Sequence, residues 1–194
     1  GGNPAGWVHI FSTGTDTSNM YPIDATFSVI EGGAGDYVGY DIDRIEDLDG
    51  DGLAELLVGV YGSSKAALFT GAQLQGGGSF SFGDAFATLS GPAYNGVDVS
   101  RVGDINGDLI PDVASGSGIG ADAWLGLWSG ADVAAGGALS SSTAIAVFSG
   151  VGTGGETIGG SDLDGDGLSD MLVTYGSNVA LVLSYDLAVE TGTN

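Results

Sequence analysis

Short runs of apolar and aromatic residues alternate along the whole chain with clusters of Gly, Ser and Asp. Short apolar runs bounded by turn residues are typical of β-strands, whereas a surface helix needs a longer stretch with helical periodicity. The pattern therefore predicts an all-β fold. The predicted strands are residues 7–11, 25–30, 42–46, 55–60, 66–70, 86–90, 97–103, 112–117, 124–128, 144–148, 157–161, 171–175, 179–184 and 187–190.

Three acidic segments repeat at an almost constant period. They read DLDGDGLAE at 47–55, DINGDLIPD at 104–112 and DLDGDGLSD at 162–170, so their first aspartates are 57 and then 58 residues apart. Each period holds about four predicted strands, and a small meander of this kind must stack on neighbours to cover its apolar faces. The repeat predicts β-propeller blades of four antiparallel strands, about three and a half of them in this chain.

The period divides the chain into four parts of one repeat domain. Residues 1–34 supply the outer strands of an incomplete blade, and 35–92, 93–150 and 151–194 each form a blade with one acidic segment. Propellers have about four to eight blades, so these parts cannot close a ring by themselves. We expect a piece of a longer propeller or a homo-oligomer that completes its blades by association, because unpaired strand edges favour pairing between chains.

Each acidic segment places oxygen-bearing side chains at positions 1, 3, 5 and 9 and a backbone carbonyl at position 7. Several ionised oxygens around one point suit a hard cation, and calcium tolerates an irregular shell better than magnesium does. We therefore expect up to three calcium ions. The predicted ligands are Asp47, Asp49, Asp51, the Leu53 carbonyl and Glu55; Asp104, Asn106, Asp108, the Ile110 carbonyl and Asp112; and Asp162, Asp164, Asp166, the Leu168 carbonyl and Asp170.

The middle loop is expected to be the weakest site. It has one carboxylate fewer, and it carries Leu109 at position 6, where the other loops have Gly52 and Gly167. If position 6 requires a positive φ, leucine adopts it at a cost of about 1 kcal/mol.

An EF-hand differs from these loops, because it needs a bidentate Glu at its twelfth position and flanking helices. Solvated acidic turns are the simpler alternative, but three crowded turns in one register favour a cation.

The charge of the chain excludes several classes of partner. There are 25 acidic and 3 basic side chains, giving a formal charge of −22. Phosphate backbones and anionic lipids repel such a surface, so we expect no nucleic acid binding, and no apolar run is long enough for membrane insertion. The chain has no cysteine. Three divalent ions would lower the net negative charge to about −16 and replace disulfides as cross-links.

The acidic loops and the strands after them resemble the FG-GAP repeats of integrin α-subunit β-propellers and of related bacterial secreted and surface proteins. In that family a Dx[DN]xDGxx[DE] loop joins the first two strands of a blade; here LLVGV at 56–60 matches the apolar strand that follows, and MLVTYG at 171–176 and residues 113–116 match it loosely. An aromatic–glycine element is present as Tyr37-x-Gly39 and Tyr94-x-Gly96. The resemblance covers most of residues 35–190. It implies an extracellular, secreted or cell-surface propeller, stabilised by calcium, that serves adhesion or protein–protein interaction.

The sequence offers little for catalysis. It has one histidine, His9, within an apolar run, and no Gly-x-Ser-x-Gly elbow, so we expect no enzymatic activity. The partner, protein or glycan, stays open. Two alternative functions stay open as well, namely a structural subunit of a self-assembling extracellular filament or surface layer, and a glycan-binding, lectin-like propeller.

Two sets of side chains bear on these alternatives. Trp7, Trp124 and Trp128 have faces that can stack on sugars, but Trp124 and Trp128 lie four apart on one strand, which favours a place in the core. Arg44 and Arg101 each lie three residues before an acidic loop. This repeated position favours a structural role, in which each arginine pairs with Asp41, Asp98 or a neighbouring acid.

Overall fold

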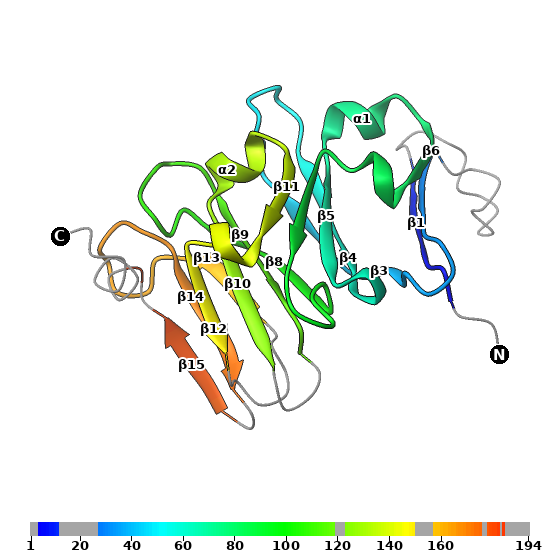
Figure 1. Cartoon of the computed structure of the whole chain (residues 1–194). Coiled ribbons are helices and arrows are strands. Elements are labelled where there is room, and N and C mark those ends of the chain that lie inside the picture. The colour runs from blue at the N-terminus through cyan, green and yellow to red at the C-terminus, as the bar shows by residue number, and fades with distance from the viewer. Residues whose placement is uncertain are drawn as a thin grey trace, which may run out of the picture.

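The computed structural model of the chain describes residues 4–11, 27–118, 123–149, 157–175, 178–182 and 184. These residues form an all-β structure in which most strand pairs are antiparallel, as the sequence predicts. Four sheets lie side by side across the molecule (Figure 1). Among the residues that the structure describes, no helix is long and apolar enough to cross a membrane. The strand predicted at 187–190 lies outside the described residues.

Consecutive strands pair in antiparallel order within three of the sheets. The first of these sheets is built from β3 (Val38–Ile45), β4 (Glu55–Val60), β5 (Lys65–Phe69) and β7 (Ala87–Ser90). The second is built from β8 (Asp98–Gly103), β9 (Asp112–Gly116), β10 (Trp124–Trp128) and β12 (Ala146–Ser149). The third contains β13 (Thr157–Ser161), β14 (Asp170–Tyr175) and β15 (Asn178–Val182).

The fourth sheet begins with β1 (Trp7–Ile10) and β2 (Ser28–Glu31), which pair in antiparallel fashion. Most strands lie within a few residues of their predicted bounds. The largest difference is β3, which begins at Val38 instead of residue 42. Its pairing with β4 shifts register between Val38 and Ile42, and this irregularity hides the start of the strand from a search for strict alternation.

Several short elements were not predicted. They are the helices α1 (Gly71–Gln75) and α2 (Gly130–Ala134), the 3-10 turns η2 (Tyr61–Ser63), η3 (Phe82–Asp84) and η4 (Ser141–Thr143), and the strands β6 (Gly78–Ser81) and β11 (Gly137–Ser140). β6 pairs with β2 and β11 with β7, both in parallel. The first full sheet contains the four predicted antiparallel strands and also has β11 as a fifth, parallel strand, which was not predicted.

Apolar clusters fill the space between neighbouring sheets. Leu57, Leu68 and Leu89 of the first full sheet pack with Trp124 and Trp128 of the second, and all five side chains are buried. The two indole rings lie edge to face, 5.7 Å apart between centroids. The prediction that these two tryptophans belong to the core is confirmed. Their faces are thus not available for sugar stacking.

The first strands of neighbouring sheets are joined by carboxylates. On β3, the side chains of Asp41 and Asp43 each accept a hydrogen bond of 2.8 Å, from the backbone N–H groups of Val99 and Arg101 on β8. In the same way, Asp98 on β8 accepts from the hydroxyl of Thr157 on β13. Negative charge at these strands therefore has a structural use, because each carboxylate satisfies a donor on the next sheet.

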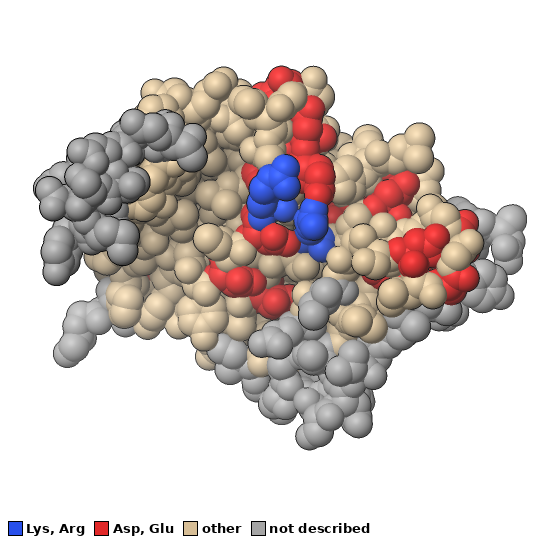
Figure 2. Space-filling view, turned by 180° about the vertical axis from the view of Figure 1, so that it is seen from behind, with Lys and Arg blue, Asp and Glu red and all other residues tan. Residues whose placement is uncertain are grey.

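An ion pair accompanies these joints. The guanidinium of Arg101 pairs with the carboxylate of Glu46, so the prediction that this arginine pairs with a neighbouring acid is confirmed. Figure 2 shows basic side chains gathered on one face and bordered by acidic ones. Both partners of the pair are more than two-fifths exposed, so solvent screens it and its contribution to stability is small.

Candidate metal sites

The three acidic loops join the first and second strands of their sheets and share one internal hydrogen-bond pattern. At position 1, Asp47 accepts from the N–H groups of Gly50 at 2.7 Å and Gly52 at 2.8 Å. Asp104 and Asp162 accept from the same two positions of their own loops. Because both oxygens of the first aspartate bind the backbone ahead of it, the chain folds back into a tight turn.

Positions 3 and 5 continue the pattern. In the first loop, Asp49 accepts from the N–H of Asp51 at 3.1 Å, and Asp51 accepts from the N–H of Leu53 at 2.7 Å. The equivalent bonds form in the other loops. Each bond uses one oxygen of its side chain and fixes the direction of the carboxylate or amide. The local sequence therefore orients these oxygen atoms through hydrogen bonds to its own backbone.

Position 6 has a positive φ in all three loops, at 89° for Gly52, 69° for Leu109 and 94° for Gly167. This confirms the condition under which a leucine would cost free energy there. Leu109 is 90% exposed, so the side chain has almost no packing to offset the cost. The middle loop is consequently the strained one.

Position 9 distinguishes the first loop. Glu55 is the first residue of β4 and is only 2% exposed. Its Oε2 accepts from the N–H of Leu48 at 2.7 Å. Its Oε1 is, among the described residues, the one buried side-chain nitrogen or oxygen without a hydrogen-bond partner. A buried carboxylate oxygen without a donor is costly unless another group satisfies it, so this atom is a candidate ligand for a cation.

The shorter aspartates at position 9 of the other loops have both oxygens engaged. Asp112 accepts from the N–H of Ile105 at 3.0 Å and from the N–H of Gly130 at 2.8 Å, and it also accepts from the side-chain amide of Asn106. Asp170 accepts from the N–H groups of Leu163 and Ser184. The repeat pattern allows either Glu or Asp at this position, but the hydrogen bonds of the two side chains differ.

The titration behaviour of the buried acids reflects the crowding of negative charge. Burial raises the pKa of Glu55 above its ordinary value, and the charges on Asp47, Asp49 and Asp51 add to this rise. Burial also raises the pKa of Asp112, to about 6, although two backbone hydrogen bonds oppose the change. Both carboxylates are therefore destabilised in their charged form, which a nearby cation would reverse.

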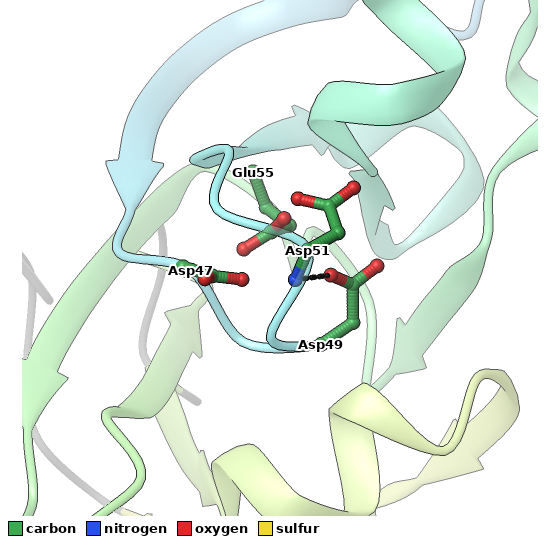
Figure 3. A group of neighbouring side chains, drawn as sticks. All are labelled: Asp47, Asp49, Asp51 and Glu55. Atoms are coloured by element: carbon green, nitrogen blue, oxygen red, sulfur yellow. Dashed lines mark hydrogen bonds between the residues drawn. The ribbon is translucent and has the colours of Figure 1, made fainter.

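Two loops bring their acids close enough to share an ion. Asp47, Asp49, Asp51 and Glu55 each offer an oxygen within 4.8 Å of the others, and Figure 3 shows these four side chains around the interior of the loop. Asp162, Asp164 and Asp166 form a second such group. Of the predicted side-chain ligands, Asp170 and the acids of the middle loop fall outside these groups. The assignment of all these side chains as ligands stays a prediction, as does that of the backbone carbonyls of Leu53, Ile110 and Leu168.

The first two acidic loops lie in a segment that matches a known family. Residues 47–115 match the FG-GAP-like repeat family. The match begins at the first aspartate of the first loop, includes the whole middle loop and ends in β9, so the predicted resemblance is confirmed. No curated protein matches the chain.

One polar contribution to the acidic loops was not predicted from the sequence. The hydroxyl of Ser129, which caps α2, donates to Asp108 at 3.3 Å, and that of Ser184 donates to Asp166 at 3.0 Å. Both serines come from the segment after the third strand of their sheet. The sequence signal was a Ser or Thr shortly after each third strand, where Thr70 occupies the equivalent place and caps α1.

A second feature that was not predicted is a cluster of tyrosines, two of which lie within the FG-GAP-like match. The ring of Tyr61 lies 4.6 Å from that of Tyr37, 4.5 Å from that of Tyr40 and 6.4 Å from that of Tyr94, measured between centroids. Tyr37 and Tyr94, the aromatic–glycine tyrosines of two successive units, both have positive φ values, of 54° and 67°. Such a backbone is rare for a bulky residue and costs free energy. Tyr40 and Tyr94 are each about half exposed.

Proposed function

We propose that this chain is an extracellular β-propeller module in which calcium stabilises FG-GAP-like repeats and whose surface binds another protein. The observation that carries the calcium part is the unpartnered Oε1 of Glu55. This buried oxygen lies close to three aspartates whose carboxylates are oriented by hydrogen bonds from the loop backbone. Oxygen-only ligands with several charges favour calcium over the softer transition metals. The match to the FG-GAP-like repeat family supports the same proposal.

In the first loop, the ion would be held by Asp47, Asp49, Asp51 and Glu55 together with the Leu53 carbonyl. A bound calcium supplies positive charge that turns the mutual repulsion of these carboxylates into attraction. The chain itself supplies the orientation, because the loop hydrogen bonds fix the aspartates and the Leu48 N–H fixes Glu55. Since the loop joins β3 to β4, ordering it stabilises the hairpin on which the sheet is built.

The other two loops would bind calcium less tightly. In the third, Asp162, Asp164 and Asp166 form a group, while both oxygens of Asp170 already accept backbone hydrogen bonds. In the middle loop, the position 9 acid is engaged in the same way, one ligand is a neutral amide and the backbone at Leu109 is strained. We expect the affinities to fall from the first to the third to the middle loop.

The partner of the module is proposed to be a protein. The tyrosine cluster presents two half-exposed rings on neighbouring units, and tyrosine is enriched in protein interfaces because it combines an apolar face with a hydrogen-bonding hydroxyl. The acids of the loops are committed to the turn hydrogen bonds and to the proposed ion, so we expect binding and not catalysis.

Isothermal titration calorimetry of the chelator-treated chain tests the calcium part. We expect saturable heat with calcium, weaker binding of magnesium and a higher melting temperature in calcium than in EDTA. Absence of calcium heat together with an unchanged melting temperature would refute the proposal. Adhesion of purified extracellular matrix proteins to the immobilised chain, compared with binding to a glycan array, tests the partner class. Binding to glycans alone would favour the lectin-like alternative.

A further inference from the structure

Two of the sheets in this chain are extended at their outer edge by a segment of the following unit. We name these segments, β6 and β11, the straps. Each strap follows the third strand and the short helix of its own unit, yet pairs in parallel with the last strand of the preceding sheet, β6 with β2 and β11 with β7. In both cases the strap residue lies 50 positions after its partner, as Gly78 does after Ser28 and Gly137 after Ala87. The straps therefore repeat in register.

The straps share a sequence that explains how they dock. Residues 77–81 read GGSFS and 136–140 read GGALS. Both glycine pairs have positive φ values, at 72° and 112° for the first pair and 77° and 89° for the second. A Cβ at Gly136 would come within 3.0 Å of the Phe86 ring, so side chains are excluded there by both backbone conformation and contact. The common form is Gly-Gly-small-apolar-Ser.

The same contacts anchor both straps. The N–H of Gly78 donates to the Phe27 carbonyl at 2.9 Å, and that of Gly137 donates to the Phe86 carbonyl at 2.8 Å. The apolar residue of each strap then packs on the sheet that it joins. Phe80 lies against the cluster that contains Ile30, and Leu139 lies against the cluster that contains Leu89. Each strap thus covers the apolar side of an outer strand.

The outer strand of the second sheet, β12, is preceded by the same backbone hydrogen bond as β2 and β7. The residue before it, Ile145, donates its N–H to the Leu127 carbonyl at 2.7 Å. Likewise, the N–H of Phe27 donates to the Ile10 carbonyl on β1, and that of Phe86 donates to the Leu68 carbonyl on β5, at 2.8 Å in both cases. Within the described part of the chain, however, no strand pairs with the outer edge of β12 and no N–H donates to the Ile145 carbonyl.

Burial differs between the outer strands that carry a strap and β12. The two apolar-side residues of β2 and of β7, which are Ser28 and Ile30, and Ala87 and Leu89, are all fully buried. Their equivalents on β12, Ala146 and Phe148, are only partly buried. On the other side of β12, Val147 is 46% exposed.

We propose that the outer edge of β12 is a docking edge for a third strap, an extended Gly-Gly-small-apolar-Ser segment supplied by another FG-GAP-like repeat unit. The segment pairs in parallel with Ala146–Ser149. Its second glycine donates to the Ile145 carbonyl, and its apolar side chain covers Phe148. This is addition of a strand to a sheet edge, in which backbone bonds give affinity and the apolar residue gives specificity. The inference does not depend on calcium binding.

The test is an NMR titration of the isotope-labelled chain, in buffer that contains calcium, with a blocked peptide of the sequence AGGALSSST, which is that of residues 135–143. We expect saturable amide shifts concentrated at residues 145–149. Two control peptides keep the length and leave the protein unchanged. One replaces both glycines by alanine, and the other replaces the leucine by aspartate. Each control should bind at least about tenfold more weakly, because it loses the backbone conformation or the apolar contact.

Three outcomes would overturn the proposal. The first is the absence of saturable shifts up to the solubility of the peptide. The second is equal binding of the three peptides, which would show an unselective edge. The third is a peptide-independent dimer in which the amides of β12 are protected, because the occupant would then be a second copy of the chain and not a strap from a further unit.

Discussion

Replacing Glu55 by glutamine separates the proposed metal ligand from the architecture around it. Glutamine has the same length, so its side-chain oxygen can still accept from the Leu48 N–H, as Oε2 of Glu55 does at 2.7 Å. The substitution removes the charge that burial and three neighbouring aspartates disfavour. It leaves a buried amide N–H₂ in place of the unpartnered oxygen, a cost of about 1–3 kcal/mol. In EDTA these effects oppose one another, so we expect Glu55→Gln to melt close to the parent chain.

In calcium the two chains should differ. A site filled at about 100 times its Kd stabilises the fold by about 2.7 kcal/mol. For a chain of this size, 1 kcal/mol shifts the melting temperature by about 2–4 °C, so the first loop should contribute about 5–11 °C of the rise caused by calcium. Glu55→Gln should lose most of that rise, because one charged ligand is gone and the remaining three still repel one another.

Differential scanning calorimetry of each chain, with and without calcium, measures this effect. The matched control is Glu31→Gln, the same chemical change at an exposed strand end outside the loops. It should keep the full calcium response. If Glu55→Gln shows the same calcium-dependent rise as the parent chain, the unpartnered oxygen of Glu55 is not a ligand and the reasoning is refuted.

Three further predictions concern the middle loop and the joints between sheets. Leu109→Gly should raise the free energy of unfolding in EDTA by about 0.5–1 kcal/mol in a urea titration, whereas Leu109→Ala should not, because alanine keeps the Cβ that a positive φ disfavours. Asp43→Ala should cost about 1–3 kcal/mol in the same assay, since it removes the acceptor of the Arg101 N–H, and an unchanged stability would contradict this role. The folded pKa of Asp112, about 6, lies above its ordinary value of 3.8. In EDTA this residue should therefore stabilise the fold by about 1 kcal/mol more at pH 5 than at pH 7. The difference in stability between the two pH values should be smaller in Asp112→Asn, and identical pH profiles of the two chains would refute the prediction.

The loops and most strands could be predicted because their signals are local. Asp and Asn at positions 1, 3 and 5 hydrogen-bond to backbone groups at most five residues ahead, so the spacing alone determines the turn. Strands such as β4 and β10 are short apolar runs bounded by turn residues, and both have the bounds that this pattern gives. The joint from Asp43 to Arg101 spans 58 residues and has no such signal.

The position 9 acids show a limit of a different kind. A sequence pattern that accepts either acid treats Glu55 and Asp112 alike, yet one additional methylene decides whether the second oxygen accepts from the protein or is left for a cation. The backbone N–H that occupies the oxygen of Asp112 comes from Gly130, 18 residues further along the chain. The hydrogen bonds of the middle loop therefore depend on the position of α2, which was not predicted from the sequence.

The straps were missed for the same non-local reason, and they change how the repeat should be divided. A run such as GGALS has the composition of a turn, and its strand character comes only from pairing with a sheet formed 50 residues earlier. The acidic loops lie within one unit, between its first two strands, whereas the carboxylate joints and the straps connect each unit to a neighbour. Removing calcium should therefore loosen hairpins within units, while the connections between units depend on Asp41, Asp43 and the glycine pairs. The high negative charge of the chain serves both purposes, because eleven of its 25 acids lie in the loops and others, at the inner strands, accept hydrogen bonds from the next sheet.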